Sequence, residues 1–310
     1  NSSPFNNPIS GKTNRQLPDI SPEALLKHHL AITNIIAQLG EIDTSALSTK
    51  EQVNHAVLLY KLKNEADSYT NKEHYMPFTA ESGFHINIHW QIKQSELSTE
   101  DDYNDYLHRL TLLPSYFDQQ MLWMKKGIEK GITHPKAAIK GFENSIASFL
   151  VDVPEKSPYF APFNNKPTNL TPKTFARLTE QAKEIISTHV TASYQKYYDF
   201  FVNTYLPAAR TTIGVSQRPE GEAYYNNRVK HYTTTSLTAE EIHTIGLQEV
   251  ARIKAEMHDV IAKLDYQGDF QSFVEFLRTD EQFYAKTPEE LLKEASYIAK
   301  KMDAQLPKLF

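Results

Sequence analysis

Histidines and carboxylates at helical spacing are the first candidates for chemistry in this chain. His85 precedes His89 by one helical turn, and Glu240 precedes His243 by a similar step. Such steps hold zinc or iron when they lie on one helix face, because the ligand atoms must reach within ~2.1 Å of one ion. The segment 83–90, however, alternates apolar and polar residues, which predicts an extended backbone with the two histidines ~13 Å apart. We therefore favour a structural or surface role for the histidine pair.

Searches for other catalytic motifs give little support for a self-contained active site. No histidine is followed by glutamate, so the His-Glu-x-x-His helix of zinc peptidases is absent from these 310 residues. Glu240 falls in the first turn of an expected helix, where the helix dipole alone favours an acid. The sequence lacks a Gly-x-Ser-x-Gly elbow and a glycine-rich phosphate loop. It also lacks cysteine, which excludes disulfides, thiolate zinc sites and cysteine nucleophiles.

A cluster of unusual residues that begins at Arg210 is the best candidate for ligand recognition. Glu222, Tyr224 and Tyr225 follow a turn glycine, and part of the segment 222–235 alternates like a strand. Arg210 could clamp a carboxylate, while the tyrosines offer phenolic donors and aromatic faces to a peptide. Alternatively, the two tyrosines pack on an extended segment, one inward and one outward. The sequence leaves both interpretations open.

The elements that must position these residues are mostly helices. Polar caps followed by apolar residues at a period of about 3.6 recur along the chain. Ser48 with Glu51 and Thr238 with Glu241 form capping boxes, and Thr171 starts a long helix with a continuous apolar stripe. A further helix is expected from Thr133 to Phe149. The expected fold is mainly α and multi-helical, with one or two short strands or extended segments at 83–90 and within 222–235.

The spacing of prolines suggests how the chain is divided. Residues 1–20 are expected to form a flexible N-terminal segment, and 21–151 a first helical subdomain. The segment 152–172 contains five prolines, a density that neither a helix nor a central strand accepts, and is predicted to be a linker. A second helical region follows over 173–310. Its last helix keeps an apolar face up to the end of the sequence, so we expect a partner that covers this face.

Charge and hydropathy exclude two classes of partner. The net charge is −5 and no long basic run occurs, so a nucleic-acid partner is not expected. No stretch approaches the ~18 apolar residues of a membrane span.

The chain starts with a polar stretch rich in Ser, Asn and Pro, which is typical of the segment behind a removed export signal or a lipid anchor. The alternative interpretation of this stretch is an arbitrary chain boundary within a flexible terminus.

Several runs of sequence resemble the bacterial domain of unknown function 885 family. They include Gly221-Glu222-Ala223-Tyr224-Tyr225 and the helix start at 237–253, and the resemblance spans most of the chain in order. The other runs are 131–136, 205–210, 233–235, 283–292 and 306–310. Runs of this length are specific to the family.

The resemblance implies a helical protein, about twice as long, that looks like a zinc metallopeptidase with its metal helix in the second half. By this resemblance, the present chain is the non-metal half and frames the substrate cleft, with Arg210, Glu222, Tyr224, Tyr225 and His85 as wall candidates. Zinc is expected in the full-length protein and none in this chain. The implied partners are the protein's own C-terminal half and a peptide. An exported protein, periplasmic or anchored by lipid in the cell envelope, is expected. The competing hypothesis is a helical binding or scaffold module without catalytic activity.

Overall fold

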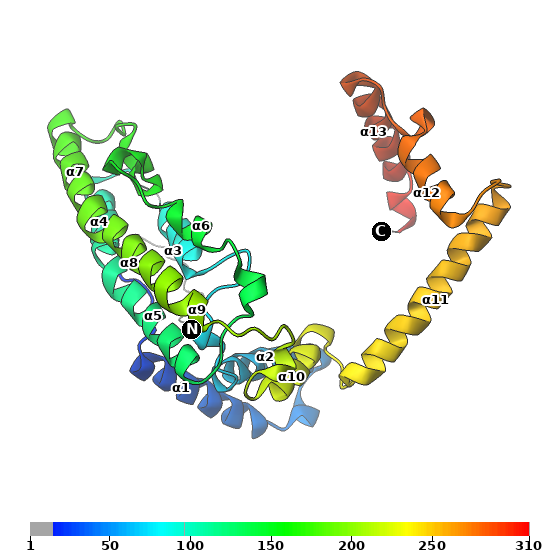
Figure 1. The fold of residues 1–310 in the computed structure, drawn as a ribbon, viewed down its shortest axis with the longest axis horizontal. Coiled ribbons are helices and arrows are strands. Elements are labelled where there is room, and N and C mark those ends of the chain that lie inside the picture. The colour runs from blue at the N-terminus through cyan, green and yellow to red at the C-terminus, as the bar shows by residue number, and fades with distance from the viewer. Residues whose placement is uncertain (1–14, 96, 310) are drawn as a thin grey trace. The chain divides into compact units, whose positions relative to one another are not determined.

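The computed structural model describes residues 15–95 and 97–309, which fall into two compact units. The first unit ends at Thr235 and the second begins at Ser236. Both are built from helices (Figure 1). Among the described residues, β-structure is limited to two isolated bridges, Phe78 with Gly83 and Pro135 with Arg210. The mainly α fold is therefore confirmed. The predicted flexible segment 1–20 lies mostly outside the described residues.

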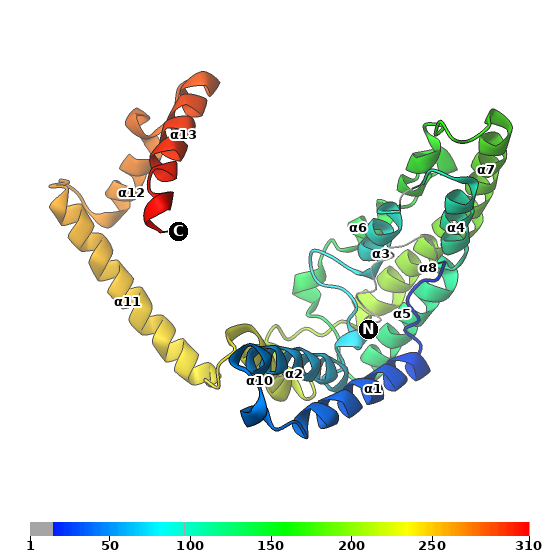
Figure 2. The ribbon, with the colours of Figure 1, turned by 180° about the vertical axis from the view of Figure 1, so that it is seen from behind.

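The first unit surrounds its core with short and long helices, seen from both sides in Figures 1 and 2. The helices are α1 (Pro22–Gly40), α2 (Thr49–Thr70), α3 (Phe84–Lys93), α4 (Glu100–Thr111), α5 (Leu113–Glu129), α6 (Glu143–Ala147), α7 (Pro172–Ile185), α8 (Ala192–Phe200), α9 (Leu206–Ala208) and α10 (Gly221–Thr233). The predicted capping box of α2 is present, because Ser48 N–H donates to Glu51 Oε2 at 2.9 Å. The loop 71–83 between α2 and α3 carries the 3-10 turn Glu73–Tyr75.

The rod formed by α7, α8 and α9 supplies the centre of the core. Its buried residues recur almost strictly every fourth position. In a regular α-helix four residues rotate by about 400° around the helix axis. Side chains at every fourth position would therefore move around the helix by about 40° per step. Two π-helical turns, Ile186–Thr191 and Phe201–Tyr205, hold more residues per turn and keep the stripe on one face. The stripe comprises Leu178, Ala182, Ile186, Val190, Tyr194, Tyr197, Phe201 and Tyr205.

The proline-rich segment 152–172 is part of the first unit rather than a connection between the units. It folds into the 3-10 turns Pro154–Lys156 and Pro158–Phe163, which need no long hydrogen-bond ladder and so accept proline. Tyr159, Phe160 and Phe163 are buried in the main core. The boundary between the two units instead falls at Thr235.

Two segments that we expected to be extended are helices. The segment 83–90 lies in α3, where Phe84, Ile88 and Ile92 form a buried stripe at a period of four. Over only eight residues, the same sequence fits both a helical and an alternating pattern of apolar residues. The structure follows the helical pattern, because its apolar stripe faces the core. The segment 222–235 lies mainly in α10. The helix expected over 133–149 is also interrupted, since Gly141 adopts φ +86° between the 3-10 turn Lys136–Ile139 and α6.

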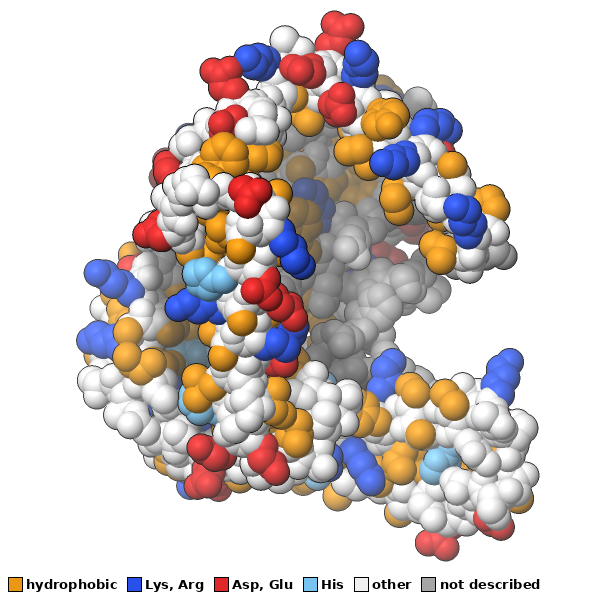
Figure 3. Space-filling model, turned by 90° about the vertical axis from the view of Figure 1, so that its right-hand side faces the viewer, with side chains coloured by type: hydrophobic (Ala, Val, Ile, Leu, Met, Phe, Trp, Pro, Cys, Tyr) orange, Lys and Arg blue, Asp and Glu red, His pale blue; other side chains and the backbone are white. Residues whose placement is uncertain are grey.

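The second unit consists of α11 (Ala239–Lys263), α12 (Phe270–Thr279) and α13 (Pro288–Asp303). Thr238 and Glu241 form the predicted capping box of α11. Within the described residues, α13 has no buried residue, and Leu291 and Leu292 are more than 60% exposed. No described helix combines the length and the apolar character that crossing a membrane requires. On the face shown in Figure 3, acidic, basic and hydrophobic side chains are interspersed.

Candidate functional site

A cavity of about 1060 Å³ lies in the first unit, between α2, the loop 71–83, α3 and α5. This volume is in the range of pockets that enclose small molecules or short peptides. Ile20 and Leu25 close one end, where Trp123 Nε1 donates to the carbonyl oxygen of Ile20 at 2.7 Å. The aromatic walls are Phe78, Phe84, Trp90, Tyr116 and Trp123.

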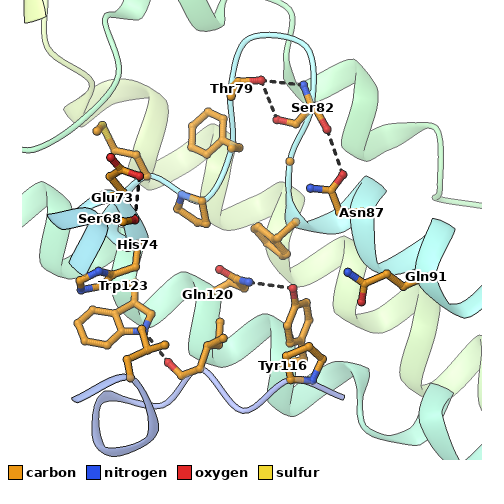
Figure 4. A pocket seen from close by; sticks show the side chains of 18 of the residues that line it. Ser68, Glu73, His74, Thr79, Ser82, Asn87, Gln91, Tyr116, Gln120 and Trp123 are labelled. Atoms are coloured by element: carbon orange, nitrogen blue, oxygen red, sulfur yellow. Dashed lines mark hydrogen bonds between the residues drawn. The ribbon is translucent and has the colours of Figure 1, made fainter. Parts of the chain in front are cut away.

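Three carboxamide side chains line the cavity (Figure 4), and Lys61, Glu65 and Glu73 add charged groups to its lining. Asn87 and Gln91 come from successive turns of α3, and Gln120 comes from α5. Asn87 Oδ1 accepts from Ser82 Oγ at 3.2 Å, and Gln120 Nε2 donates to the Tyr116 hydroxyl at 3.0 Å. Gln91 Oε1 is buried and has no hydrogen-bond partner among the described residues. Each carboxamide carries both donors and an acceptor, so the group complements peptide bonds without adding charge.

The opposite side of the cavity carries Ser68, Glu73 and His74 (Figure 4). Glu73 Oε2 accepts from Ser68 Oγ at 2.8 Å, and its Oε1 lies 3.1 Å from Arg228 Nη1. The His74 ring meets the Trp123 ring edge-on at 4.4 Å. Burial, with smaller contributions from Lys126 and Lys72, lowers the pKa of His74 to about 4. The imidazole is therefore neutral near pH 7 and packs against the rings of Tyr69 and Trp123.

Arg210 forms hydrogen bonds within the loop that precedes α10 and to Thr133. Its Nε donates to the carbonyl oxygen of Thr133 at 3.0 Å, and Nη1 donates to the carbonyl oxygens of Thr212 and Gly214 at 2.6 and 2.8 Å. Burial lowers the pKa of this guanidinium. Its contacts in the structure are with carbonyl and hydroxyl oxygens of the loop.

The other predicted wall residues of this region lie on α10. Glu222 is exposed and Tyr225 is 45% exposed. The Tyr224 ring lies near two guanidinium groups, with the central carbons of Arg218 and Arg228 at 4.2 and 5.7 Å from its centroid. Burial raises the pKa of Tyr224. Through Arg228 and Glu73, Tyr224 is connected to the wall of the cavity.

His85 lies in the core and is not among the residues that line the cavity, although its ring meets that of the lining residue Phe84 edge-on at 5.9 Å. Its side chain has no exposed surface, and its Nε2 lies 3.1 Å from Ser145 Oγ. Burial lowers the pKa of His85 to about 4, so the ring is neutral. The structure therefore does not bring His85 together with Arg210 and Tyr224.

The described residues do not fit a zinc site. They contain no group of three His, Asp or Glu side chains that could hold a metal ion. The helical backbone of α3 does place His85 and His89 one turn apart, contrary to the expected ~13 Å. Both rings, however, pack against aromatic side chains, with His89 edge-on to Tyr159 at 4.8 Å. Glu240 and His243 are exposed on α11.

The three carboxamides of the cavity were not among the residues predicted from the sequence. Asn87, Gln91 and Gln120 carry no motif, and the first two share a face only when 83–93 is helical. The i to i+4 spacing of Asn87 and Gln91 was the available signal, but it was hidden by the apparent alternation. Arg218, which is buried beside Tyr224, was missed for the same lack of a motif.

Residues 4–310 match the sequence pattern of a protein family that is described as "bacterial protein of unknown function (DUF885)". The chain belongs to the DUF885 family. A solved structure with the same fold is that of "the putative lipoprotein from Colwellia psychrerythraea", which is 21% identical at a TM-score of 0.77. The match covers 93% of this DUF885 chain and 52% of the Colwellia chain, so this chain spans about half the length of that protein. No curated protein matches the chain.

Proposed function

We propose that this chain is the peptide-binding, non-metal half of a zinc-dependent peptidase of the cell envelope. The observation that carries the proposal is the cavity whose aromatic walls surround the carboxamides of Asn87, Gln91 and Gln120. An extended peptide presents alternating carbonyl and N–H groups between side chains, and the cavity offers uncharged partners to both.

In this proposal, the zinc ion and its ligands belong to a part of a longer protein outside these 310 residues. The length of the Colwellia chain and the exposed apolar face of α13 support this division. The remaining half would cover that face and complete the cleft. The wall candidates Arg210, Glu222, Tyr224 and Tyr225 keep their proposed role as a second border of the cleft. The likeness to a Colwellia protein described as a putative lipoprotein supports a periplasmic or lipid-anchored location.

Peptide binding to the 310-residue chain is the direct test. Trp90 and Trp123 both line the cavity and are the chain's two tryptophans, so their fluorescence reports on its occupancy. A panel of N-acetylated, C-amidated tripeptides avoids terminal charges. We expect saturable fluorescence changes with the wild type. The proposal fails if none of these peptides produces one.

Elemental analysis tests whether the zinc ion is bound outside these 310 residues. The longer natural protein should contain stoichiometric zinc and cleave peptides, whereas the 310-residue chain should do neither. Stoichiometric zinc in the 310-residue chain would contradict the proposed division. The second candidate function, a binding module without catalysis, is favoured if the longer protein binds the same peptides but leaves them intact.

A further inference from the structure

A buried arginine next to α10 is left with unused donors. Only 5% of the surface of Arg218 is exposed, and its guanidinium stacks on the Tyr224 ring at 4.2 Å. Its Nε and Nη1 atoms are buried, and neither finds a hydrogen-bond partner within 15–95 and 97–309. Because a guanidinium stays protonated in proteins, a positive charge with free N–H groups is enclosed here. Buried charges of this kind are normally paired.

The first turn of α10 adds more donors at the same place. The helix starts at Gly221 without a side-chain cap, after Glu220 in the left-handed conformation at φ 57°. The N–H groups of Gly221 and Tyr224 bond backbone carbonyls, whereas no backbone acceptor in the described structure receives those of Glu222 and Ala223. A Cβ on Gly221 would lie 2.9 Å from Arg218 Cγ, so the arginine stem runs along this first turn. The positive end of the helix dipole therefore adjoins the aliphatic stem of Arg218.

Two acids of this region are already paired with other cations. Glu220 pairs with Lys72 at 2.6 Å, and Glu73 pairs with Arg228 at 3.1 Å. Arg210, whose charge also acts on Arg218, donates to oxygens of its own loop and to Thr133. The region thus combines four cations with three acids, since the exposed Glu222 lies in the first turn of α10. Among the described residues, Nε and Nη1 of Arg218 and Nε of Arg228 are its buried donors without a hydrogen-bond partner. A water molecule could accept a hydrogen bond from Arg218 but could not balance its charge.

We infer that Arg218 and the first turn of α10 form an oxyanion-binding site. Its ligand is a carboxylate or a phosphate, since both present oxygen acceptors with negative charge to a guanidinium and to helix N–H groups. Tyr224 fixes the guanidinium plane by stacking. The site stands apart from the cavity and its inference does not depend on peptide binding there.

Nuclear magnetic resonance of the wild-type 310-residue chain tests the site without disturbing its fold. The Nε–H signal of Arg218 is assigned by its loss in the Arg218→Lys variant. Three probes are titrated separately: inorganic phosphate, acetyl-dialanine with a free carboxylate, and its C-terminal amide. We expect the signal to shift saturably with phosphate, with the carboxylate or with both, and to ignore the amide. The signal of Arg177, which pairs with Glu100 on the surface, is the control.

The two oxyanion probes separate the sources of the ligand. A response to the carboxylate alone identifies peptide C-termini or small acids, and a response to phosphate alone identifies a phosphate ligand. Arg218→Lys should bind the effective probe at least about tenfold more weakly, because an ammonium lacks the planar array of donors. The site is refuted if neither oxyanion shifts the Arg218 signal, or if the amide shifts it equally. Blocked peptides that bind the cavity leave this signal unchanged, so the two proposals fail separately.

Discussion

Acid should destabilise the first unit through three buried histidines. Burial lowers the pKa values of His74, His85 and His134 to about 4 in the folded unit, against 6.5 for an exposed histidine. Because the unfolded chain takes up these protons at higher pH, the stabilising contribution is complete above about pH 6.5 and is lost as the pH falls towards 4. Between about pH 7 and pH 5, each histidine should lower the free energy of unfolding by about 1.8 kcal/mol, and the three together by about 5 kcal/mol.

His85→Gln isolates one of these contributions. Glutamine still reaches Ser145 with a hydrogen-bonding group but does not titrate, so the loss of stability between about pH 7 and pH 5 should shrink by about 1.8 kcal/mol. Urea unfolding followed by tryptophan fluorescence reports on this unit, since Trp90 and Trp123 both belong to it. Carboxylates such as Asp102, whose pKa is lowered by hydrogen bonds from Thr99, titrate below this window.

His189→Gln is the matched control, since His189 is only partly buried on the rod and its Nδ1 lies 2.9 Å from Thr188 Oγ1. The control should retain the wild-type loss of stability. If His85→Gln loses as much stability on acidification as the wild type, the argument that His85 is buried in its neutral form is wrong.

Further predictions concern the cavity and the packing. Gln91→Met should weaken binding of a blocked tripeptide by about two- to tenfold in a fluorescence titration. It should leave the free energy of unfolding in urea unchanged or higher, because it removes an unpaired buried acceptor. Gln94→Met, at the exposed end of α3, is the control for both measurements. Gly127→Ala should cost about 1–3 kcal/mol in urea unfolding, since its Cβ would lie 2.7 Å from the carbonyl oxygen of Ile132, whereas Gly40→Ala, with nothing within 4 Å, should not destabilise. Ser48→Ala should cost about 1 kcal/mol through loss of the α2 cap, and an unchanged melting temperature would contradict this.

Much of the helical framework could be predicted because its signals are local. Ser48 with Glu51 and Thr238 with Glu241 satisfy backbone N–H groups within one turn, so the residues that start a helix lie next to each other in the sequence. The stripe of the α7–α9 rod was equally visible. Its two π-helical turns were not, because they adjust the backbone to a core that the sequence does not display.

The site was harder to predict because it depends on side chains from distant segments. Gln91 and Gln120 meet across one cavity only after α3 packs beside α5, and neither belongs to a motif. The choice between helix and strand at 83–90 was decided by the burial of Phe84, Ile88 and Ile92, which is a tertiary effect. Tyr224 was identified from the cluster of unusual residues that begins at Arg210, but its two guanidinium neighbours are a result of the fold.

A crystal structure of the 310-residue chain with its tightest-binding blocked tripeptide tests the central claim most directly. We predict the peptide inside the cavity, with backbone groups hydrogen-bonded to the carboxamides of Asn87, Gln91 or Gln120 and a side chain against Trp123. A peptide bound at another surface, with no contact to these carboxamides, would contradict the account.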